Sequence, residues 1–422
     1  MSDPEGHSEI GREALERILE VTRQLARPLD LHEMLGQVVE AGLSVLGADR
    51  GTVFLYDPDR DELFSTVATG TDTLRIPADR GIVGECIRSR QVINVPDCYA
   101  DPRFNRDVDR KTGYHTRCLL TVPLVGHDDH LVGVLQVLNK SVGVFTRQDE
   151  RIATALAAQC AVALQRARLL KDLVAKEKME RELSVAREIQ MRVFPKTMPD
   201  LPGYDIAGWS RPADATGGDT FDIIVTGKDQ VVLLLGDATG HGIGPALSVS
   251  QVRAMLRMGL RLGAGIHEAF RHMNDQLSDD LASNRFVTAF LGTLDIGAHQ
   301  VRYHSGGQAP ILHFRAATGT CELLNASTMP LGLMSGSVRG EPRSLSLAPG
   351  DILALITDGI FEYENARGEA FGEDRVMGIL REHQGSPMAG VLEQIVSDVE
   401  AFSGGAPQND DMTILLARRL SD

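Results

Sequence analysis

The sequence predicts an α+β protein in which a long helix connects two domains. Short strand-like segments separated by turns occur in both halves of the 422-residue chain, as is typical of antiparallel sheets. Between the halves, residues 148–193 contain neither proline nor glycine, the two residues that most often interrupt a helix. In the second half, four aspartates lie beside apolar segments of strand length. The chain is long enough for two or three domains, each with its own core.

Composition narrows the classes of partner. The formal net charge of −15 at pH 7 argues against nucleic acid or an anionic membrane as the main partner. The chain has five cysteines and no Cys-x-x-Cys pair, which favours reduced thiols. Its first residues lack the basic and apolar pattern of a signal peptide, and no apolar run reaches the roughly 18 residues of a membrane helix. We therefore expect a cytoplasmic protein that binds neither nucleic acid nor membrane.

The pattern of the first half predicts two helices followed by a sheet. Apolar residues at helical spacing predict helices over residues 10–26 and 31–46, and we assign the first to a separate N-terminal segment, residues 1–29. The elements expected next are strands 52–56 and 63–68, a helix 81–88, a strand 92–95, a polar loop 97–114, and strands 118–125 and 132–138. This order is typical of a compact α+β domain.

A motif after the last of these strands points to a known type of domain. Asn139-Lys140 is followed by Phe145 and then by Asp149-Glu150. With this motif, residues 30–166 resemble a GAF domain, a small-molecule sensing module, of the cyclic-nucleotide type. The resemblance implies an antiparallel sheet with helices, a ligand such as a cyclic nucleotide under residues 97–114, and a motif that locks the pocket. The same residues also fit a strand-end turn followed by a helix with an acidic first turn.

A linker helix is expected over residues 167–195. Its apolar side chains recur at irregular spacing, at Leu169, Leu173, Met179 and Leu183, and do not form a clean heptad pattern. Pro195 is expected to end the helix. The helix is either a stiff spacer or a dimerising signal helix. The apolar stripe favours the second interpretation and therefore a homodimer.

Aspartates border several of the strand-like segments in the second half. Asp237 and Asp358 follow the apolar residues 231–235 and 352–356, whereas Asp219 and Asp410 precede residues 223–225 and 414–416. Strand ends and strand starts meet at the same edge of an antiparallel sheet, so we expect these four side chains to gather there. Four carboxylates cannot all stay ionised together without a countercharge. Mg²⁺ or Mn²⁺ is the natural countercharge for an all-oxygen cluster.

The second half resembles the SpoIIE branch of the PPM-type serine/threonine phosphatases. The matching motifs are Glu188-Ile189-Gln190 to Phe194-Pro195, Gly217-Gly218-Asp219 to Asp222, Gly236-Asp237 to Gly240-His241-Gly242, Gly306-Gly307-Gln308-Ala309-Pro310, Thr357-Asp358-Gly359 with Glu362, and Asp410-Asp411-Met412-Thr413. Gln308 stands where the family usually has His, a position that is not a proposed metal ligand. For residues 196–422 the resemblance implies two packed antiparallel sheets flanked by helices, and hydrolysis of phosphoserine or phosphothreonine on a protein.

The resemblance also implies roles for individual residues. Asp237 and a water would bridge two Mg²⁺ or Mn²⁺ ions. Asp358 and Asp410 would complete the coordination of one ion, whereas Asp219 and the backbone carbonyl of Ala238 would help to hold the other.

Two further residues have two interpretations each. Animal-type relatives bind phosphate through an arginine near the first acidic motif, and Arg211 is the nearest arginine here, although Arg-Pro is also an ordinary turn. His241 is a candidate proton donor to the leaving serine oxygen, although a histidine with a structural role in the turn fits equally well.

The implied partner is a phosphorylated antagonist of an anti-sigma factor. Two alternatives stay open: a catalytically weak scaffold that senses a GAF ligand and acts by protein binding, and a two-metal nucleotide cyclase fused to a GAF domain. Retention of all four aspartates favours an enzyme over the scaffold. A cyclase does not explain the Asp-Asp-Met-Thr motif or the Gly-Gly-Asp motif.

Overall fold

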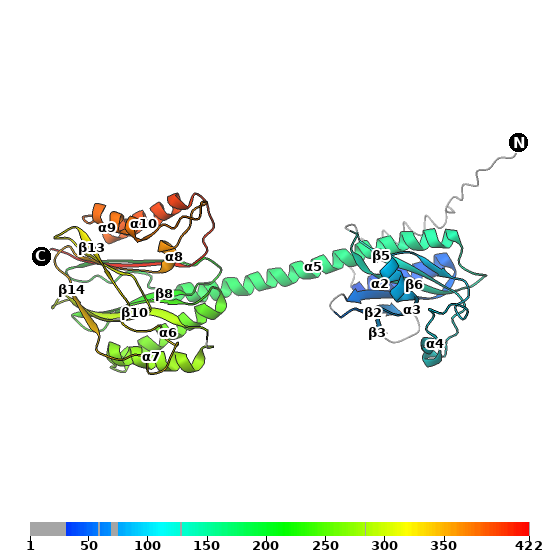
Figure 1. Cartoon of the computed structure of the whole chain (residues 1–422), viewed down its shortest axis with the longest axis horizontal. Helices are drawn as coiled ribbons and strands as arrows, with labels where there is room; N and C mark the ends of the chain where they lie inside the picture. The colour runs from blue at the N-terminus through cyan, green and yellow to red at the C-terminus, as the bar shows by residue number, and fades with distance from the viewer. Residues whose placement is uncertain (1–30, 58–59, 69–74, 127–128, 283, 422) are drawn as a thin grey trace. The chain divides into compact units, whose positions relative to one another are not determined.

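The computed structural model describes residues 31–57, 60–68, 75–126, 129–282 and 284–421. The chain divides into two compact units, residues 1–177 and 178–422, which are described separately (Figure 1). The N-terminal helix expected within residues 1–29 lies outside the described residues. Among the described residues, no helix combines the length and the apolar character needed to cross a membrane.

The N-terminal unit is built around a six-stranded antiparallel sheet with the strand order β3-β2-β1-β6-β5-β4. Its elements are α2 (Leu31–Leu46), β1 (Ala48–Asp57), β2 (Glu62–Ala68), β3 (Arg75–Pro77), α3 (Gly81–Ser89), β4 (Ile93–Val95), α4 (Arg106–Thr112), β5 (Leu119–Val125), β6 (Leu131–Lys140) and the first part of α5 (Arg147–Val193). Apart from β3 and α4, these elements agree with the sequence pattern to within a few residues.

Helices cover both faces of this sheet because its strands are apolar on both faces. On one face, α2 and the first part of α5 contribute Leu35 and Leu156 to a core that includes Val122 of β5. On the other face, α3 contributes Cys86 to a second core that includes Phe54 of β1. The alanine-rich start of α5 therefore packs on this unit, as its composition predicted.

The expectation of a continuous loop over residues 97–114 was wrong, because this segment contains α4. The side chain of Asn105 accepts a hydrogen bond from the N–H of Asp107 and so satisfies one of the free donors at the helix start. Gly113, with a φ of 67°, ends the helix in the left-handed region. A short polar helix has no apolar periodicity, so its capping residues were the only available signal.

The C-terminal unit consists of two five-stranded antiparallel sheets, which confirms the predicted sandwich. The first sheet has the order β14-β11-β10-β9-β8 and the second the order β13-β12-β15-β16-β7. The strands are β7 (Tyr204–Arg211), β8 (Asp219–Val225), β9 (Gln230–Ala238), β10 (Val287–Asp295), β11 (Gln300–Gly306), β12 (Ile311–Arg315), β13 (Thr320–Leu324), β14 (Arg343–Ser346), β15 (Ile352–Ile356) and β16 (Met412–Arg419). The helices are α6 (Ile243–Arg261), α7 (Ile266–Asp280), α8 (Asp358–Phe361), α9 (Glu373–Glu382) and α10 (Met388–Ser403).

Apolar side chains fill the space between the two sheets and beneath the helices. Leu233 of β9 and Leu355 of β15 belong to the central layer. Leu234 belongs to the cluster beneath α6 and α7, and Ile356 belongs to the cluster beneath α9 and α10. These helix pairs form the outer layers of the sandwich (Figure 1). β9 is therefore buried on both faces, as its continuous apolar run predicted.

Strand boundaries near the aspartates differ from the sequence pattern. β9 continues through Asp237 instead of ending at Gly236, and β8 begins at Asp219 instead of near Ile223. Asp358 starts the short helix α8, which was not predicted, and neither were β7 and β14. The polar strand ends were missed because backbone pairing between Asp219 and Asp237, not an apolar pattern, extends β8 and β9 there.

α5 is one continuous helix from Arg147 to Val193, which confirms the prediction that the segment without proline or glycine is an uninterrupted helix. It ends two residues before Pro195, in keeping with the bias against helical backbone in the residue that precedes a proline. Leu169, Leu173 and Met179 of the predicted apolar stripe are exposed.

The contact between α7 and β11 generates a prediction about acid stability. Burial, together with the neighbouring His267, lowers the pKa of His304 to about 4, and the two imidazoles lie 2.9 Å apart between Nδ1 and Nε2. An unfolded histidine titrates near 6.5, so the unfolded state binds more protons between about pH 6.5 and pH 4, and stability falls as the pH drops through this window. We expect His304→Gln to lose less stability than wild type between pH 7 and pH 5.

Urea midpoints at the two pH values measure this difference. His272→Gln is the matched control, because His272 is an exposed histidine of α7, the helix that carries His267, and its replacement should leave the wild-type acid sensitivity unchanged. Equal acid sensitivity of His304→Gln and wild type would contradict the prediction.

Candidate active site

Two of the four aspartates face each other across neighbouring strands. The register of β8 and β9 pairs Asp219 directly with Asp237. Asp219 is 3% exposed, and its Oδ2 accepts a hydrogen bond of 2.8 Å from Oγ1 of Thr357. Thr357 belongs to the other sheet, at the end of β15 and immediately before Asp358. This hydrogen bond joins the two sheets at the acidic end of the sandwich.

The four aspartates come from two sheets and not from one sheet edge, which corrects the topological argument made from the sequence. Asp219 and Asp237 lie in the first sheet, whereas Asp358 and Asp410 flank β15 and β16 of the second. Asp358 and Asp410 are nevertheless close enough to raise the pKa of Asp237. The expectation that the four carboxylates gather was therefore correct, and the geometry that gathers them is the packing of two sheets.

Glycines allow the backbone segments of the site to approach one another. A Cβ atom at Gly218 would lie 2.7 Å from the carbonyl oxygen of Ala238, and one at Gly359 would lie 1.9 Å from the carbonyl oxygen of Asp411. Real Cβ contacts are longer than this, so a side chain at either position would push the segments apart. The Ala238 N–H also donates a 2.9 Å hydrogen bond to Gly218. The Ala238 carbonyl is thus held beside the Gly-Gly-Asp motif.

Burial and mutual repulsion raise the pKa values of the clustered carboxyl groups. Burial and then Asp237 raise the pKa of Asp219 well above its usual range. Burial, followed by Asp358 and Asp410, raises the pKa of Asp237 to about 7. Burial and Asp410 also raise the pKa of Asp358. Asp219 is buried and Asp237 half-buried, whereas Asp358 and Asp410 are exposed, so the cluster is an acidic basin that concentrates negative charge at the partly solvated end of the sandwich.

This donor set fits hard divalent cations. Among the described residues, no group of three or more His, Cys, Asp or Glu side chains is placed so that these side chains alone could hold a metal ion. Mg²⁺ commonly keeps several waters and uses only one or two carboxylates, so one or two of these aspartates and a backbone carbonyl can hold it together with water.

Several residues near the cluster had no assigned role in the sequence interpretation. Asp411 is 3% exposed; it accepts a 2.7 Å hydrogen bond from the Ala213 N–H and a second hydrogen bond from the Gly218 N–H. Thr357 is fully buried, and its Oγ1 accepts from the Thr413 N–H at 2.9 Å. These contacts join residues that are far apart in the chain. In the sequence, the only indication of a role for Asp411 and Thr357 was that each is adjacent to a predicted aspartate.

Asp222, the last residue of the first acidic motif, lies in a separate ion-pair cluster. Its side chain is fully buried. Its carboxylate lies 2.9 Å from Nε of Arg253 and accepts hydrogen bonds of 2.6 and 2.8 Å from Arg257. Because both arginines belong to α6, this cluster fastens the helix that follows the glycine-rich turn to β8.

Arg211 and His241 each have a carboxylate partner. Nε of Arg211 donates to Gln408 at 2.9 Å, and its guanidinium also pairs with Glu400. Gln408 in turn donates to the backbone carbonyl of Asp410 at 2.8 Å. Nδ1 of His241 lies 2.6 Å from Oδ2 of Asp214.

Gln308 lies between the two sheets beside the cluster. Its Nε2 donates to the Ile356 carbonyl at 3.1 Å, and its Oε1 accepts from Thr288 at 3.0 Å. Thr288 is the cross-strand neighbour of Asp237. The amide therefore holds β10 and β15 together at the level of the aspartates.

The C-terminal end of α5 contacts the loop that carries Asp219. Gln190 is buried; its Nε2 donates to the Gly217 carbonyl at 2.6 Å, and its Oε1 accepts from the Gly217 N–H at 3.0 Å. Arg187 donates to the Asp214 carbonyl at 3.3 Å. The position of this helix end therefore affects the loop that precedes the first aspartate.

The N-terminal unit contains a cavity of about 240 Å³. Apolar residues such as Phe54 and Leu119 line it together with the polar side chains of Arg50, Arg80 and Gln136. Residues of α4 and of the segments around it also line the cavity, so part of the segment 97–114 covers it. A cavity of this kind suits a small ligand with both apolar and anionic groups.

The five residues of the Asn-Lys, Phe, Asp-Glu motif lie outside the lining of this cavity. Lys140 forms an ion pair with Asp149, and Asp149 accepts from the N–H of Thr146 at 2.7 Å. Asn139 accepts from the Arg117 N–H at 2.6 Å. Nδ2 of Asn94 donates at 2.9 Å to the Phe145 carbonyl and at 2.9 Å to Glu150. These bonds fasten β6 and the start of α5 to β4 and β5.

Comparison with known families matches both units. Residues 227–420 match the family model of Stage II sporulation protein E (SpoIIE), and residues 30–164 match that of the GAF domain. The SiaA-PP2C domain of Pseudomonas aeruginosa is 24% identical, covers 59% of this chain and 98% of its own, and has a TM-score of 0.50. This likeness supports the sandwich fold.

Two other relatives share smaller parts of their length. The RsbU and RsbW domains of a Mycobacterium tuberculosis protein are 29% identical with a TM-score of 0.45, over 53% of this chain and 61% of the other. A probable 3′,5′-cyclic phosphodiesterase of Caenorhabditis elegans is 29% identical over 187 residues, which are 41% of this chain. The chain spans only 25% of that curated relative.

The Asp222 cluster generates a prediction about stability. Asp222→Ala leaves Arg253 and Arg257 without their buried carboxylate, and breaking a buried ion pair in this way typically costs about 3–5 kcal/mol. We therefore expect the C-terminal unit to unfold at a clearly lower urea concentration. Asp229→Ala, in the exposed turn between β8 and β9, is the matched control and should change the free energy of unfolding by less than about 0.5 kcal/mol. An effect of Asp222→Ala as small as that of the control would show that the cluster does not anchor α6.

Proposed function

The chain joins a GAF domain to a SpoIIE-type PPM serine/threonine phosphatase domain, and we propose that it dephosphorylates a regulatory phosphoprotein under the control of the GAF domain. The observation that carries this proposal is the pairing of Asp219 with Asp237 beside Asp358 and Asp410, which both raise the pKa of Asp237. A scaffold without activity would have no need to keep these four repelling carboxylates together. By resemblance, the proposed substrate is a phosphorylated antagonist of an anti-sigma factor.

We propose that the aspartates hold two Mg²⁺ or Mn²⁺ ions. Asp237 would contact both ions, Asp219 and the Ala238 carbonyl would contribute to one, and Asp358 and Asp410 to the other. When bound, such ions lower the pKa of a water nucleophile and neutralise phosphate oxygens. The raised pKa of Asp237 supports this assignment, because bound cations would let the carboxylates ionise together at neutral pH.

His241 is the proposed proton donor to the leaving serine oxygen. The contact between Nδ1 and the Asp214 carboxylate orients the imidazole and leaves Nε2 available. Arg211 remains a proposed substrate-binding residue only if its guanidinium leaves Glu400. In its present position it instead supports the loop of Asp410 through Gln408.

The N-terminal unit is the proposed sensor. Its cavity offers Arg50 and Arg80 to an anionic ligand, and one relative is a probable cyclic phosphodiesterase, so a cyclic nucleotide is the ligand that we propose to test. Exposed Leu169 and Leu173 on α5 support the proposal that the chain forms a homodimer through this helix. Helix movement would reach the site through Gln190, which bonds both polar backbone atoms of Gly217.

Replacement of the central aspartate tests the proposed chemistry. Asp237→Asn keeps the size of the side chain and removes one negative charge from both proposed ion positions. We expect it to lower the turnover of p-nitrophenyl phosphate by about a thousandfold or more, on the scale of lost electrostatic stabilisation, and we expect EDTA to abolish the activity of the wild type. Asp229→Asn, in the turn at the far end of the same hairpin, is the matched control. Near-wild-type turnover of Asp237→Asn would refute the assignment.

A two-residue insertion after Lys176 tests coupling through α5. At about 3.6 residues per turn it rotates the following part of the helix by about 200° without breaking it. We expect the insertion to change phosphatase activity by about 5- to 150-fold, the usual range for coupled sites, because it changes the rotational phase in which a movement of the N-terminal unit reaches Gln190 through the helix. A four-residue insertion adds about 400° of rotation, only about 40° more than a full turn, and is the control that should largely preserve the response. Unchanged activity after the two-residue insertion would contradict this coupling.

A further inference from the structure

One side of the acidic basin is bordered by a loop that continues the first sheet. Ala238 pairs with Val287, and Val287 exchanges hydrogen bonds of 2.9 and 2.8 Å with Leu331. Leu331 thus lies one further step across the sheet from the strand that carries Asp237. The segment Met329–Met334 is consequently part of the border of the site, although it is about 90 residues away in the sequence.

Polar side chains of α7 fix the shape of this loop. Asn274 is fully buried; its Nδ2 donates to the Met334 carbonyl at 3.0 Å, and its Oδ1 accepts from the Gly332 N–H at 3.2 Å. Asp275 accepts from the Gly336 N–H at 2.8 Å and from the Ser335 hydroxyl at 3.0 Å. These contacts, together with the fully buried Leu331, therefore anchor the loop in one conformation.

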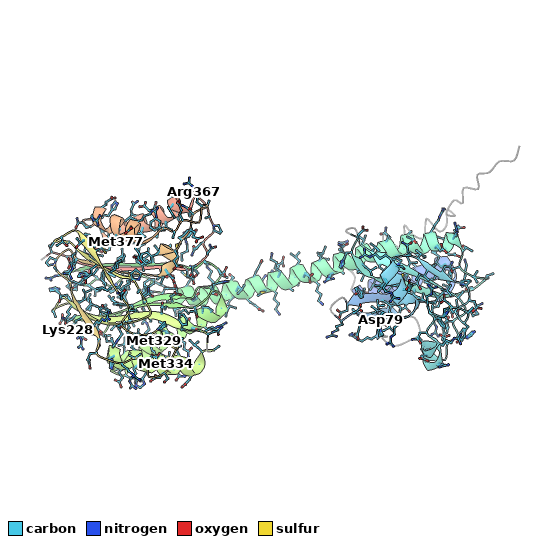
Figure 2. The ribbon with its side chains drawn as sticks, viewed as in Figure 1. Asp79, Lys228, Met329, Met334, Arg367 and Met377 are labelled. Carbon is cyan, nitrogen blue, oxygen red and sulfur yellow. The ribbon has the colours of Figure 1, made fainter. Side chains whose placement is uncertain are left out.

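The anchored loop presents apolar side chains to solvent. Met329 is 48% exposed, Leu333 46% and Met334 51%. Figure 2 labels Met329 and Met334 in the part of the unit where Figure 1 labels β10 and α7. Three neighbouring apolar side chains on an ordered loop beside a reaction site are typical of a surface that contacts a partner. Methionine in particular adapts to the shape of the partner that it contacts.

Arg285 lies at the same border, two residues before Val287. A Cβ atom at Gly244 would be 2.6 Å from its Nη1, so the guanidinium rests on the first turn of α6, just beyond His241. Arg285 is exposed, and with the described residues its guanidinium forms no ion pair. Arg211 and Arg257, by contrast, are held by Glu400 and Asp222. Arg285 therefore lies beside the acidic basin, and its guanidinium can pair with an anionic group of a ligand.

We propose that Arg285, Met329, Leu333 and Met334 form a docking rim that selects the protein substrate. The rim fits a phosphoprotein that carries an acidic residue and an apolar side chain beside its phosphoserine. Any such protein must pass this border when its phosphate enters the basin, and the free guanidinium complements an acidic group. The guanidinium rests on α6 and not among the carboxylates, so it suits a neighbour of the phosphoserine better than the phosphate itself. This inference rests on the proposed phosphatase function.

The test compares substrates that differ only beside the phosphate. The probes for the full chain with Mn²⁺ are p-nitrophenyl phosphate and two phosphoserine peptides of equal length. One peptide has an aspartate and a leucine beside the phosphoserine, and the other has serine and glycine at those positions. The variants are Arg285→Gln and the double variant Leu333→Ser with Met334→Ser.

Matched controls remove similar side chains far from the basin. Lys228→Gln removes an exposed cation from the turn between β8 and β9, at the opposite end of the hairpin from Asp219 and Asp237 (Figure 2). Leu262→Ser removes an 80% exposed leucine at the far end of α6. Urea midpoints of all variants establish that each protein is folded.

We expect each rim variant to lower kcat/KM for the acidic, apolar peptide by about tenfold, the effect of losing one good contact. Values for p-nitrophenyl phosphate and for the serine-glycine peptide should stay within about twofold of wild type, as should all values for the two controls.

Two outcomes would overturn the docking rim while leaving the phosphatase assignment intact. In the first, the rim variants cleave every probe as wild type does. In the second, Arg285→Gln loses p-nitrophenyl phosphate turnover by the same factor, which would place its guanidinium on the scissile phosphate. A wild-type protein that hydrolyses none of the probes would instead refute the proposed function and the rim with it.

Discussion

Repulsion among closely spaced carboxylates is the constraint on which the rest of the catalytic unit depends. Asp219 and Asp237 are cross-strand neighbours, and burial together with the nearby acids raises the pKa values of both. An arrangement of this kind is costly in an empty site and favourable only when cations enter it. The guanidinium of Arg211, which is linked to the Asp410 loop through Gln408, is paired with Glu400 and not with these aspartates.

Two packed sheets, and not one, keep these carboxylates at fixed positions. Each sheet supplies two of the aspartates, so the basin exists only while the sandwich is closed. Thr357 and Gln308 cross between the sheets at this level through hydrogen bonds to Asp219 and Thr288. Within each sheet, Gly218 and Gly359 let neighbouring backbone segments approach more closely than any side chain would allow. The repulsion is thus opposed by polar contacts and by backbone proximity at the same end of the unit.

The sequence was sufficient to predict the apolar strands, the long helix and the gathering of the four aspartates, because each depends on a local pattern. It was insufficient for α4 and α8, which are too short to show an apolar periodicity, and for the sheet to which each aspartate belongs. Pairs such as Asp214 with His241 and Gln190 with Gly217 are 27 residues apart and have no periodicity that would indicate them. Asp222 matched a motif, yet only the structure separates its anchoring role from the acidic basin.

The loop from Ala213 to Gly218 is where the separate parts of the mechanism meet. Gln190 of α5 holds Gly217, Asp411 holds Ala213 and Gly218, and Asp214 holds His241. A displacement of the helix end therefore moves the backbone that leads to Asp219. It also moves Asp214, the partner of the proposed proton donor, and the N–H groups through which Asp411 of the second sheet holds the loop. Because tightly packed segments shift between discrete arrangements and do not deform gradually, such a loop can convert a small helix movement into a change of the whole acidic basin. A signal carried by α5 would then act on the geometry of the carboxylates before any substrate reaches them.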